Sequence, residues 1–566
     1  MTMEELRYPV GVQTFSEIRN GGYVYVDKTW CIPLLESGKF YFLGRPRRFG
    51  KSLLLSMLHE YYAGNRGLFN GLAIDRLRPE EWTPRPVFHI DLNGQDFTAA
   101  DSVYNNLQRQ LVDYEERYEV AKVEGSLSDR FISVVKKACD KTGRKVVILI
   151  DEYDKPLTDN ILNEELYVAH QGALRGFYSA LKTLDPYIKL ALLTGVTKFG
   201  KVNVFSGLNN LYDISLDDEF SAICGITEDE LHAYFDPGVH AMALKNDMDK
   251  DAMYAELKKQ YDGYHFSADC PDIYNPFSLL LSLRKGETGN YWFSTGTTKM
   301  LVDLVMRNNI SLRDLDEEVY MKDDLSNITE FISDPVPLLY QTGYLTIKSY
   351  NRKTTEFTLR YPNEEVENGF LNEFLKGYGG VRVKPNSCAS ALSELLQEGK
   401  PEEFLKRLNA FFASMPYDLR KYQDYESYWQ TVMYVLLTML GYHTEAERHT
   451  SEGSIDLLVK TPGYIYVIEL KVADRRRRKD SYMPDETGEV DWLAEPMTPY
   501  GEQKEEEQKF ENEDDTAEIR RVLDAAVRQI EERCYVGAFA SDGRKVIKIA
   551  AVFSAARHRL AKTKIF

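Results

Sequence analysis

The sequence contains few cysteines, and none of them are paired. Six cysteines stand singly along 566 residues, without the two-residue spacing of a structural zinc site. Scattered single cysteines are typical of reduced thiols, so we expect neither a disulfide framework nor a structural zinc site. They are Cys31, Cys139, Cys224, Cys270, Cys388 and Cys534.

Long hydrophobic runs are also missing. The longest, such as residues 432–440, are too short to cross a bilayer. The first residues lack the apolar core of a signal peptide. We therefore expect a cytoplasmic protein with no membrane partner.

The chain has fewer positively than negatively charged residues. The chain carries 70 Lys and Arg against 88 Asp and Glu, which gives a net charge of −18. This balance excludes a uniformly basic surface for nucleic acid, although a local basic groove stays compatible with it. With 43% hydrophobic residues, a chain of this length should form two to four packed domains.

Residues 44–52 read Gly-Arg-Pro-Arg-Arg-Phe-Gly-Lys-Ser and lie between an apolar run (40–43) and an expected helix (53–58). A strand, loop and helix in this order suit a phosphate loop, because the helix N-terminus offers unpaired N–H groups to an anion. Lys51 would then reach the terminal phosphates of ATP, and Ser52 would ligate Mg²⁺. Arg45 stands where a glycine is usual, so a plain loop and helix cap is the alternative.

Residues 145–152, Lys-Val-Val-Ile-Leu-Ile-Asp-Glu, predict a parallel strand buried on both faces. Asp151, at its carboxyl end, would hold the Mg²⁺ hydration shell, and Glu152 would polarise the attacking water. The alternative is a strand that simply ends in acidic residues at the surface.

Further strands are expected at 86–92 and 188–195, separated by helices such as 102–119, which predicts a doubly wound α/β sheet. An extra strand between the phosphate loop and the acidic strand is typical of NTPases with a catalytic glutamate. The next strand then presents a polar sensor, for which Thr194 is the candidate; an ordinary strand-end threonine is the alternative.

These motifs resemble the AAA-ATPase-like family, whose members carry a C-terminal nuclease-like domain. The resemblance implies that Arg45 is a family trait and that Arg47, Arg48 and Gly50 belong to the nucleotide site. Whether Arg47 or Arg48 touches phosphate or only neutralises it stays open. The matching stretches are 25–29, 45–52, 150–156, 193–199, 261–264, 274–278 and 361–364.

Residues 217–385 predict a mainly helical lid or connector, with a hairpin at 343–359. They show no spacing typical of metal ligands or nucleophiles, and for His265 a turn or core role is favoured. On a helix of the first domain, Arg175 could serve as an arginine finger, but a surface ion pair is favoured. Whether the protein forms a homo-oligomer therefore stays open.

Residues 454–471 predict a hairpin that turns at Pro462-Gly463, a pair suited to a type II turn. Counting back along both strands sets Asp456 opposite Glu469, and Lys471 shares the face of Glu469. Opposed carboxylates repel unless a divalent cation lies between them. Mg²⁺ or Mn²⁺ there, with a lysine to orient a water, is the chemistry of Asp…Glu-x-Lys phosphodiesterases; a surface hairpin is the alternative.

The order of helix, hairpin, helix and strand resembles the PD-(D/E)xK nuclease superfamily. The first helix would begin at Glu426, the second would carry Gln529, and a strand would follow at 535–539. The resemblance assigns Glu426, Asp456, Glu469, Lys471 and Gln529 to the motif positions. A charged insert at 474–517, which the family usually lacks, is expected to be solvated.

We therefore predict a P-loop NTPase of the AAA-like, additional-strand type (1–216), a helical lid or connector (217–385) and a restriction-endonuclease-like α/β domain (386–566). The leading hypothesis is ATP-dependent control of a metal-dependent nuclease that acts on DNA or RNA. Its alternative is a nucleotide-switched signalling or interaction protein whose nuclease-like domain only binds. A purely structural protein would require both motif sets to be accidental.

Overall fold

The computed structural model divides into two compact units, one up to Phe370 and one from Leu371. Each unit is described by itself. The residues described are 6–79, 82–120, 125–198, 210–293, 298–308, 315, 319–326, 334–379, 392–413, 433, 436–437, 443–450, 453–473, 513–532, 539, 542–554 and 559–566.

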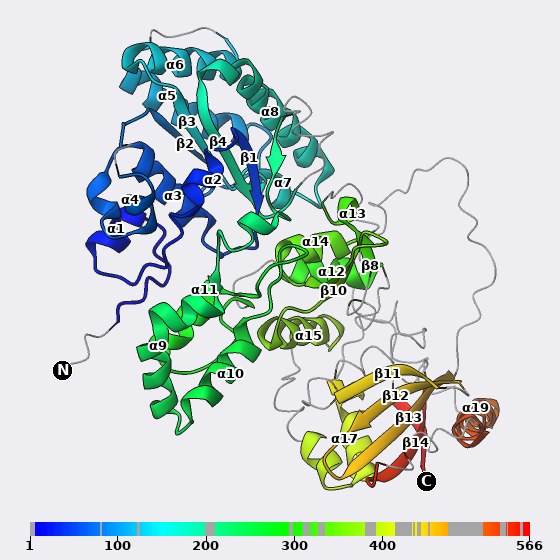
Figure 1. The fold of residues 1–566 in the computed structure, drawn as a ribbon. Helices are drawn as coiled ribbons and strands as arrows, with labels where there is room; N and C mark the ends of the chain where they lie inside the picture. Colours follow the sequence, from blue (N-terminus) through cyan, green and yellow to red (C-terminus); the bar gives the residue numbers. More distant parts are fainter. Residues whose placement is uncertain are drawn as a thin grey trace, which may run out of the picture. The chain divides into compact units, whose positions relative to one another are not determined.

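The first unit contains a five-stranded parallel sheet in the order β2-β3-β4-β1-β5 (Figure 1). The strand that lies between β1, which precedes the phosphate loop, and the acidic strand β3 is β4, which carries Thr194; the strand expected at 86–92 is β2, at the edge of the sheet. Every residue of β3 is buried, as expected of a β-branched central strand. The strands are β1 (Phe40–Gly44), β2 (Val87–Asp91), β3 (Val146–Asp151), β4 (Ile188–Gly195) and β5 (Tyr212–Asp213).

Helices cover both faces of this sheet, which confirms the doubly wound prediction (Figure 1). On one face, α5 (Ser102–Tyr118), α6 (Leu127–Thr142) and α8 (Glu164–Thr183) bury a continuous hydrophobic core. On the other, α3 (Lys51–Tyr62) packs against β2 and β3. Shorter helices are α1 (Phe15–Asn20), α2 (Cys31–Leu35), α4 (Ala73–Leu77), α7 (Lys155–Thr158), η1 (Arg66–Phe69), η2 (Asp185–Tyr187) and η3 (Asp218–Phe220).

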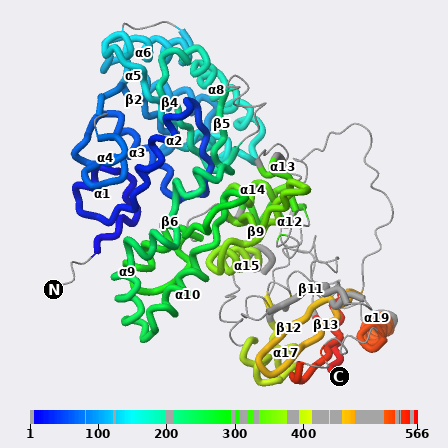
Figure 2. Tube along the Cα trace, in the orientation of Figure 1, coloured from blue at the N-terminus to red at the C-terminus, as the bar shows by residue number. Residues whose placement is uncertain are grey.

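After the sheet the chain becomes helical, and Figure 2 shows β6 at the point of this change. Tyr8, Val24 and Val26 of the N-terminal segment pack against this new core, so the start of the chain lies against the helices that follow the sheet. The elements are β6 (Ile226–Thr227), α9 (Glu228–Lys245), α10 (Lys250–Tyr261), β7 (Ile273–Tyr274) and α11 (Pro276–Lys285).

The predicted hairpin is present as two antiparallel strands, β9 (Thr346–Asn351) and β10 (Glu356–Arg360). Residues up to 370 form one compact unit, so the predicted limit at 216/217 does not separate two units. Strand β8 (Val319–Met321) pairs with β10. The other elements of this stretch are α12 (Thr298–Arg307), α13 (Lys322–Ser326), α14 (Val336–Thr342) and α15 (Glu364–Gly379).

The second unit contains a mixed five-stranded sheet in the order β11-β12-β13-β14-β15, with β13 and β14 parallel. Its core joins the sheet to α19. The elements are α17 (Pro401–Ala413), β11 (His443–Thr450), β12 (Gly453–Lys460), β13 (Tyr464–Ala473), α19 (Glu513–Glu532), β14 (Lys545–Ser554) and β15 (Arg559–Ile565).

Two predictions for the second unit need correction. Residues 513–517, which we assigned to the charged insert, form the start of α19, where acidic residues favour the positive end of the helix dipole. Of the expected strand at 535–539, only Phe539 is among the described residues, and it lies in a helical turn. The described strand that follows α19 is β14.

Candidate functional site

The phosphate loop runs from the end of β1 to the start of α3. Gly50 caps α3 with a left-handed backbone, φ 99°, which a glycine adopts without steric cost. Arg48 also has a positive φ, 65°. The loop therefore ends in a tight turn that leads directly into a helix N-terminus, with Lys51 and Ser52 in its first turn.

Lys51 is buried against its own loop. Its Nζ donates hydrogen bonds to the carbonyl oxygens of Arg45, at 2.8 Å, and Pro46, at 3.0 Å. Burial lowers the pKa of Lys51, although the nearby carboxylates of Glu152 and Asp151 oppose this shift. The ammonium is thus held by carbonyl dipoles while two acidic groups lie nearby.

Arg45 supports the loop from behind and is 1% exposed. Its guanidinium donates to the carbonyl oxygens of Gly44 and Ser215, both at 2.8 Å, and of Phe220, at 3.0 Å. It also lies 4.2 Å from the ring centre of Phe266. These contacts give a structural reason for an arginine where a glycine is usual.

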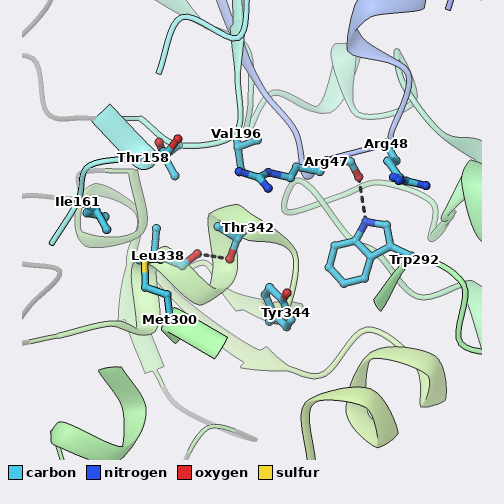
Figure 3. Close-up of a pocket in the computed structure, with 11 residues that line it drawn as sticks. Arg47, Arg48, Thr158, Ile161, Val196, Trp292, Met300, Leu338, Thr342 and Tyr344 are labelled. Atoms are coloured by element: carbon cyan, nitrogen blue, oxygen red, sulfur yellow. Dashed lines mark hydrogen bonds between the residues drawn. The ribbon is translucent and has the colours of Figure 1, made fainter. Parts of the chain in front are cut away.

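Arg47 and Arg48 differ in their surroundings. The Arg48 guanidinium lies 4.0 Å from the ring centre of Phe277, and burial lowers its pKa. The main-chain oxygen of Arg47 accepts a hydrogen bond from the Trp292 indole at 2.9 Å. In Figure 3 the Arg47 side chain extends toward Val196, while Arg48 points away. Both arginines line the cavity described next.

A cavity of about 530 Å³ opens at the start of α3. Its polar wall contains Arg47, Arg48, Gly50, Lys51, Ser52 and Glu152. Its apolar wall comes from the N-terminal segment and from α9 and α11, and includes Val10, Val12, Val26, Phe235 and Leu280. One cavity thus brings charged loop residues together with hydrophobic side chains that are distant in sequence.

Asp151 and Thr194 form a buried pair at the carboxyl ends of neighbouring strands. The Thr194 hydroxyl donates to Asp151 Oδ1 at 2.7 Å, and the Glu152 amide donates to the same oxygen at 3.1 Å. These two hydrogen bonds fix the Asp151 carboxylate. Both residues are buried, whereas Glu152 is the acidic member that lines the cavity.

Glu152 has a left-handed backbone, φ 48°, at the point where β3 ends. Such a backbone is uncommon for a non-glycine residue and is found at functional sites. Burial raises the pKa of Glu152, while Lys51 opposes the rise and Asp151 adds to it. A carboxylate with a raised pKa is a better proton acceptor than an ordinary one.

Asp154 is a residue that sequence reasoning did not select. Its carboxylate is 2% exposed and accepts hydrogen bonds from the Val196 amide at 3.0 Å and from the Thr197 amide and hydroxyl at 2.6 Å each. Burial raises its pKa despite these bonds. Asp154 therefore ties the loop after β3 to the loop after β4; its place beside Asp151-Glu152 was the available signal.

In the second unit, the hairpin has the predicted register. Leu457 pairs with Ile468 and Lys460 with Ile465, so the same count sets Asp456 opposite Glu469. The Lys471 Nζ lies 2.9 Å from Glu469 Oε1 and 3.7 Å from Asp456 Oδ2. Asp456 Oδ2 also accepts the Leu470 amide at 2.9 Å. The two carboxylates and the lysine are thus brought together.

Comparison with known families now bears on both regions. Residues 9–205 match the family model described as "Predicted AAA-ATPase", and residues 424–494 match the PD-(D/E)XK nuclease superfamily. A protein of Azotobacter chroococcum mcd 1, described as "Uncharacterized protein in vnfD 5'region", is 38% identical over 483 residues, which is 83% of this chain and 90% of that protein. The chain belongs to the AAA-ATPase-like family.

Two further residues of the predicted nuclease motif in this AAA-ATPase-like protein are Gln529 and Glu426. Gln529 is half-buried on α19, a helix that packs against β13 and β14. Alternate residues of β13, Ile465, Val467 and Ala473, share the core with α19, so Glu469 and Lys471 lie on the same face of the sheet as this helix. Glu426 lies outside the described residues.

The predicted type II turn is wrong. A type II turn needs a positive φ at its third residue, and Gly463 does not have one. The Thr461 hydroxyl accepts the Tyr464 amide at 3.0 Å, and the Thr461 amide donates to the Tyr464 carbonyl at 2.8 Å. The threonine side chain thus closes the hairpin and keeps the register without that turn.

The described residues of this AAA-ATPase-like chain contain neither a cluster of metal ligands nor a helix that could cross a membrane. No group of three or more His, Cys, Asp and Glu residues there could hold a metal ion. The oxygen donors of Asp456 and Glu469 nevertheless suit a hard divalent cation. Among the same residues, every helix is too short or too polar to span a membrane.

Proposed function

We propose that the first unit binds and hydrolyses ATP, and that the second unit is a metal-dependent nuclease under its control. The observation that carries the first part is the cavity at the start of α3. Lys51, Ser52 and Glu152 line it together, although Glu152 lies 100 residues further along the chain. The proposal for the second part rests on the Asp456, Glu469 and Lys471 cluster.

In the nucleotide site, the Lys51 ammonium would leave the loop carbonyls and bind the β- and γ-phosphates, with the backbone amides from Gly50 onward. Ser52 and Asp151 would hold Mg²⁺, which neutralises phosphate charge when bound. Glu152 would accept a proton from the attacking water. Thr194 would position the Asp151 carboxylate through their hydrogen bond.

Arg47 is our candidate for the additional positive charge at the γ-phosphate. Its carbonyl oxygen is held by the Trp292 indole, and the residue is part of the cavity wall. Arg48 is better suited to closing the site, because its guanidinium lies over Phe277 of α11. Arg175 is exposed on α8 and has no comparable support for a role in this cavity.

The apolar wall of the cavity suits the adenine ring. Val10 and Val12 precede the sheet, whereas Phe235 and Leu280 come from α9 and α11. A base between them would connect the N-terminal segment to the helices. Lys28 already joins these parts through Glu230, with Nζ 2.6 Å from Oε1.

In the nuclease site, Asp456 and Glu469 would hold Mg²⁺ or Mn²⁺, which stabilises charge on the scissile phosphate when bound. Lys471 would orient or deprotonate the attacking water. Glu426 and Gln529 would complete the motif. DNA and RNA both contain the phosphodiester that this group can cleave.

The second candidate is a nucleotide-switched protein whose nuclease-like domain binds without cleaving. One observation favours it: the Lys471 ammonium already lies at Glu469 and within 3.7 Å of Asp456. An ammonium between two carboxylates reduces their repulsion, as a metal ion would. Binding of nucleic acid or of a protein would then need no metal.

The test is to measure ATP turnover and cleavage of labelled DNA and RNA, with Mg²⁺ or Mn²⁺, in the wild type, Lys51→Ala and Asp456→Ala. We expect Lys51→Ala to lose turnover and Asp456→Ala to lose cleavage. Cleavage that survives Asp456→Ala unchanged would refute the nuclease assignment. Tight ATP binding with negligible turnover, and no metal binding at Asp456, would favour the switch.

A further inference from the structure

A second cavity of the first unit shares a wall with the nucleotide cavity. Its volume is about 1030 Å³, roughly twice the 530 Å³ of the nucleotide cavity. The N-terminal segment, the second half of α9 and the end of α11 form its walls. Val10 and Val12 of the N-terminal segment line both cavities. The second cavity therefore lies next to the proposed ATP site without being part of it.

Every charged residue in the wall of this second cavity is cationic, and we call the cavity the basic groove. The four residues are Arg7, Lys245, Arg284 and Lys285. In a chain with a net charge of −18, a wall whose described residues include no aspartate or glutamate is a local exception. Four positive charges in one groove attract a polyanion.

The cations of the basic groove are not used up by ion pairs. Among the described residues, none of the four has a carboxylate partner. The Arg7 guanidinium lies 4.5 Å from the ring centre of Tyr23. The Lys245 ammonium donates to the Lys285 carbonyl at 2.6 Å, and the Lys285 ammonium lies 4.4 Å from the ring centre of Tyr291. These neutral contacts hold the side chains and leave their charge for a ligand.

The ends of two helices offer another reason for three of these charges. α9 ends at Lys245 and α11 ends at Lys285, and cations are favourable near a helix C-terminus. Arg284 lies in the same last turn of α11. Arg7 is different, because it comes from the N-terminal segment and still adds its charge to the groove. Helix capping alone therefore does not account for the groove.

The rest of the basic groove is largely apolar and includes the tyrosines Tyr8 and Tyr23. The Tyr8 hydroxyl lies against α9 at Gly238, where any larger side chain would collide with it. Tyr23 is half-buried beside Arg7. Cationic groups combined with aromatic rings are typical of grooves for single-stranded nucleic acid, which offers phosphates to the first and bases to the second. An acidic peptide would use the charges and leave the rings without a partner.

We propose that the basic groove binds a single-stranded nucleic acid, and that residues 8–12 couple its occupancy to the nucleotide cavity. The choice of nucleic acid rests on the proposed function, because a nuclease must hold the strand that it cleaves. The coupling rests on the shared wall. Gly11, between Val10 and Val12, has a φ of 79°, and the Val12 amide donates to the Pro9 carbonyl at 3.2 Å. A ligand that moves this turn changes the wall of both cavities.

The experiment is to measure binding of fluorescent oligothymidylate and oligouridylate to the full-length protein by anisotropy, in EDTA and between about 50 and 200 mM salt. For Arg284→Ala/Lys285→Ala we expect the slope of log K against log salt to become shallower by about 1.4, and affinity to fall roughly tenfold or more. The matched control is Lys137→Ala/Lys182→Ala, which removes the same charge from exposed positions of α6 and α8 and should keep the wild-type slope. A wild-type slope in the groove variant would overturn the proposal.

This outcome is independent of the nuclease assignment. EDTA removes the metal that cleavage needs, so binding is read whether or not the second unit is a nuclease. Failure of the nuclease assignment appears instead as absence of cleavage when Mg²⁺ or Mn²⁺ is added. The two failures are therefore distinguished on one preparation.

Arg7→Gln separates ligand binding from helix capping, because Arg7 lies outside both helices. We expect the slope to become shallower by about 0.7, the value for one phosphate contact of a single strand. A double variant of Arg284 and Lys285 that melts earlier but binds with the wild-type slope would show that these charges only cap α11. Poly-glutamate that binds more tightly than either oligonucleotide would assign the groove to an acidic peptide and contradict the proposal.

The coupling is measured in Glu152→Gln/Asp456→Asn, in which neither ATP nor the oligonucleotide should be consumed. We expect Mg²⁺ and ATP to change the oligonucleotide affinity by about fivefold or more, and the oligonucleotide to change the ATP affinity by the same factor. An oligonucleotide affinity that is the same with and without ATP would refute the coupling through residues 8–12.

Discussion

The two candidate sites differ in where their lysine lies. In the nucleotide site, Lys51 is bonded to two backbone carbonyls, and Asp151 is satisfied by Thr194 and by an amide. In the hairpin, the Lys471 ammonium forms an ion pair with the Glu469 carboxylate at 2.9 Å. The first arrangement keeps an ammonium for an incoming anion. The second partly neutralises the two carboxylates that a metal ion would need, so a metal ion must either displace the lysine or bind the carboxylates beside it.

The sites also differ in how many segments build them. The cavity combines the phosphate loop, the end of β3, the N-terminal segment, α9 and α11. The described part of the hairpin site comes from two adjacent strands. A site assembled from distant segments can respond to movement between them, whereas a single hairpin is fixed by its register.

Loss of the Lys51 ammonium should have the largest effect. We expect Lys51→Ala to lower ATP turnover by roughly 100-fold or more, as for removal of a preorganised charge at the transition state. The matched control is Lys155→Ala, which lines the same cavity but pairs with Asp159 at 2.8 Å. Steady-state phosphate release measures both. Equal losses in the two variants would argue against a specific role for Lys51.

Glu152→Gln should separate binding from hydrolysis. We expect turnover to fall by about 100-fold, since a general base contributes at least that much, while ATP affinity is retained. Burial raises the pKa of Glu152. As the pH falls through that raised pKa, the carboxylate becomes protonated and can no longer act as a base, so wild-type turnover should decline. In Glu152→Gln this acid limb should be absent from the pH profile. An identical limb in the variant would exclude Glu152 as its source.

Metal binding tests whether the hairpin carboxylates can hold an ion although Lys471 lies beside them. At a concentration 100 times its dissociation constant, Mn²⁺ should stabilise the folded second unit by about 2.7 kcal/mol. Asp456→Asn should abolish this shift in a thermal melt. Asp542→Asn, which breaks the pair with Arg544 in the same unit, should keep it. A full Mn²⁺ shift in Asp456→Asn would place the ion elsewhere.

The contact between the N-terminal segment and α9 should affect stability. Lys28→Met removes the ion-pair partner of Glu230, which then keeps, among the described residues, only the Thr227 amide, and the loss of this mostly buried pair should cost about 2 kcal/mol of unfolding free energy. Lys39→Met breaks the more exposed pair with Asp185 and should cost under about 1 kcal/mol. Urea denaturation compares them. A reversed order would mean that the Lys28 pair does not hold these parts together.

The smallest change is expected in the hairpin turn. Gly463 has no positive φ, and a Cβ there would meet nothing within 4 Å. Gly463→Ala should therefore stay within about 0.5 kcal/mol of the wild type. At Gly343, φ is 89° and a Cβ would lie 2.7 Å from Pro46, so Gly343→Ala should destabilise more. A costly Gly463→Ala would show that the turn depends on glycine after all.

The sequence was sufficient where the decisive interaction is local. Strand periodicity and spacing predicted β1, β3 and β4, and the position of the turn set Asp456 against Glu469. The type II turn failed because a side chain, Thr461, replaces the expected backbone geometry. Local periodicity holds no information on such a bond.

Long-range contacts account for what was missed. The burial of Arg45 depends on carbonyl groups about 170 residues away. The role of Asp154 depends on Thr197, and the anchoring of His265 depends on Thr346. Each needs the fold to bring the partner close, and no spacing along the chain shows it.

The most direct test of two separate active sites is to measure ATP hydrolysis and nucleic-acid cleavage on the same preparations of Glu152→Gln and Asp456→Asn. We predict that Asp456→Asn hydrolyses ATP like the wild type but does not cleave, whereas Glu152→Gln loses hydrolysis and the ATP dependence of cleavage. Cleavage at the wild-type rate by Asp456→Asn, or hydrolysis at the wild-type rate by Glu152→Gln, would contradict the account.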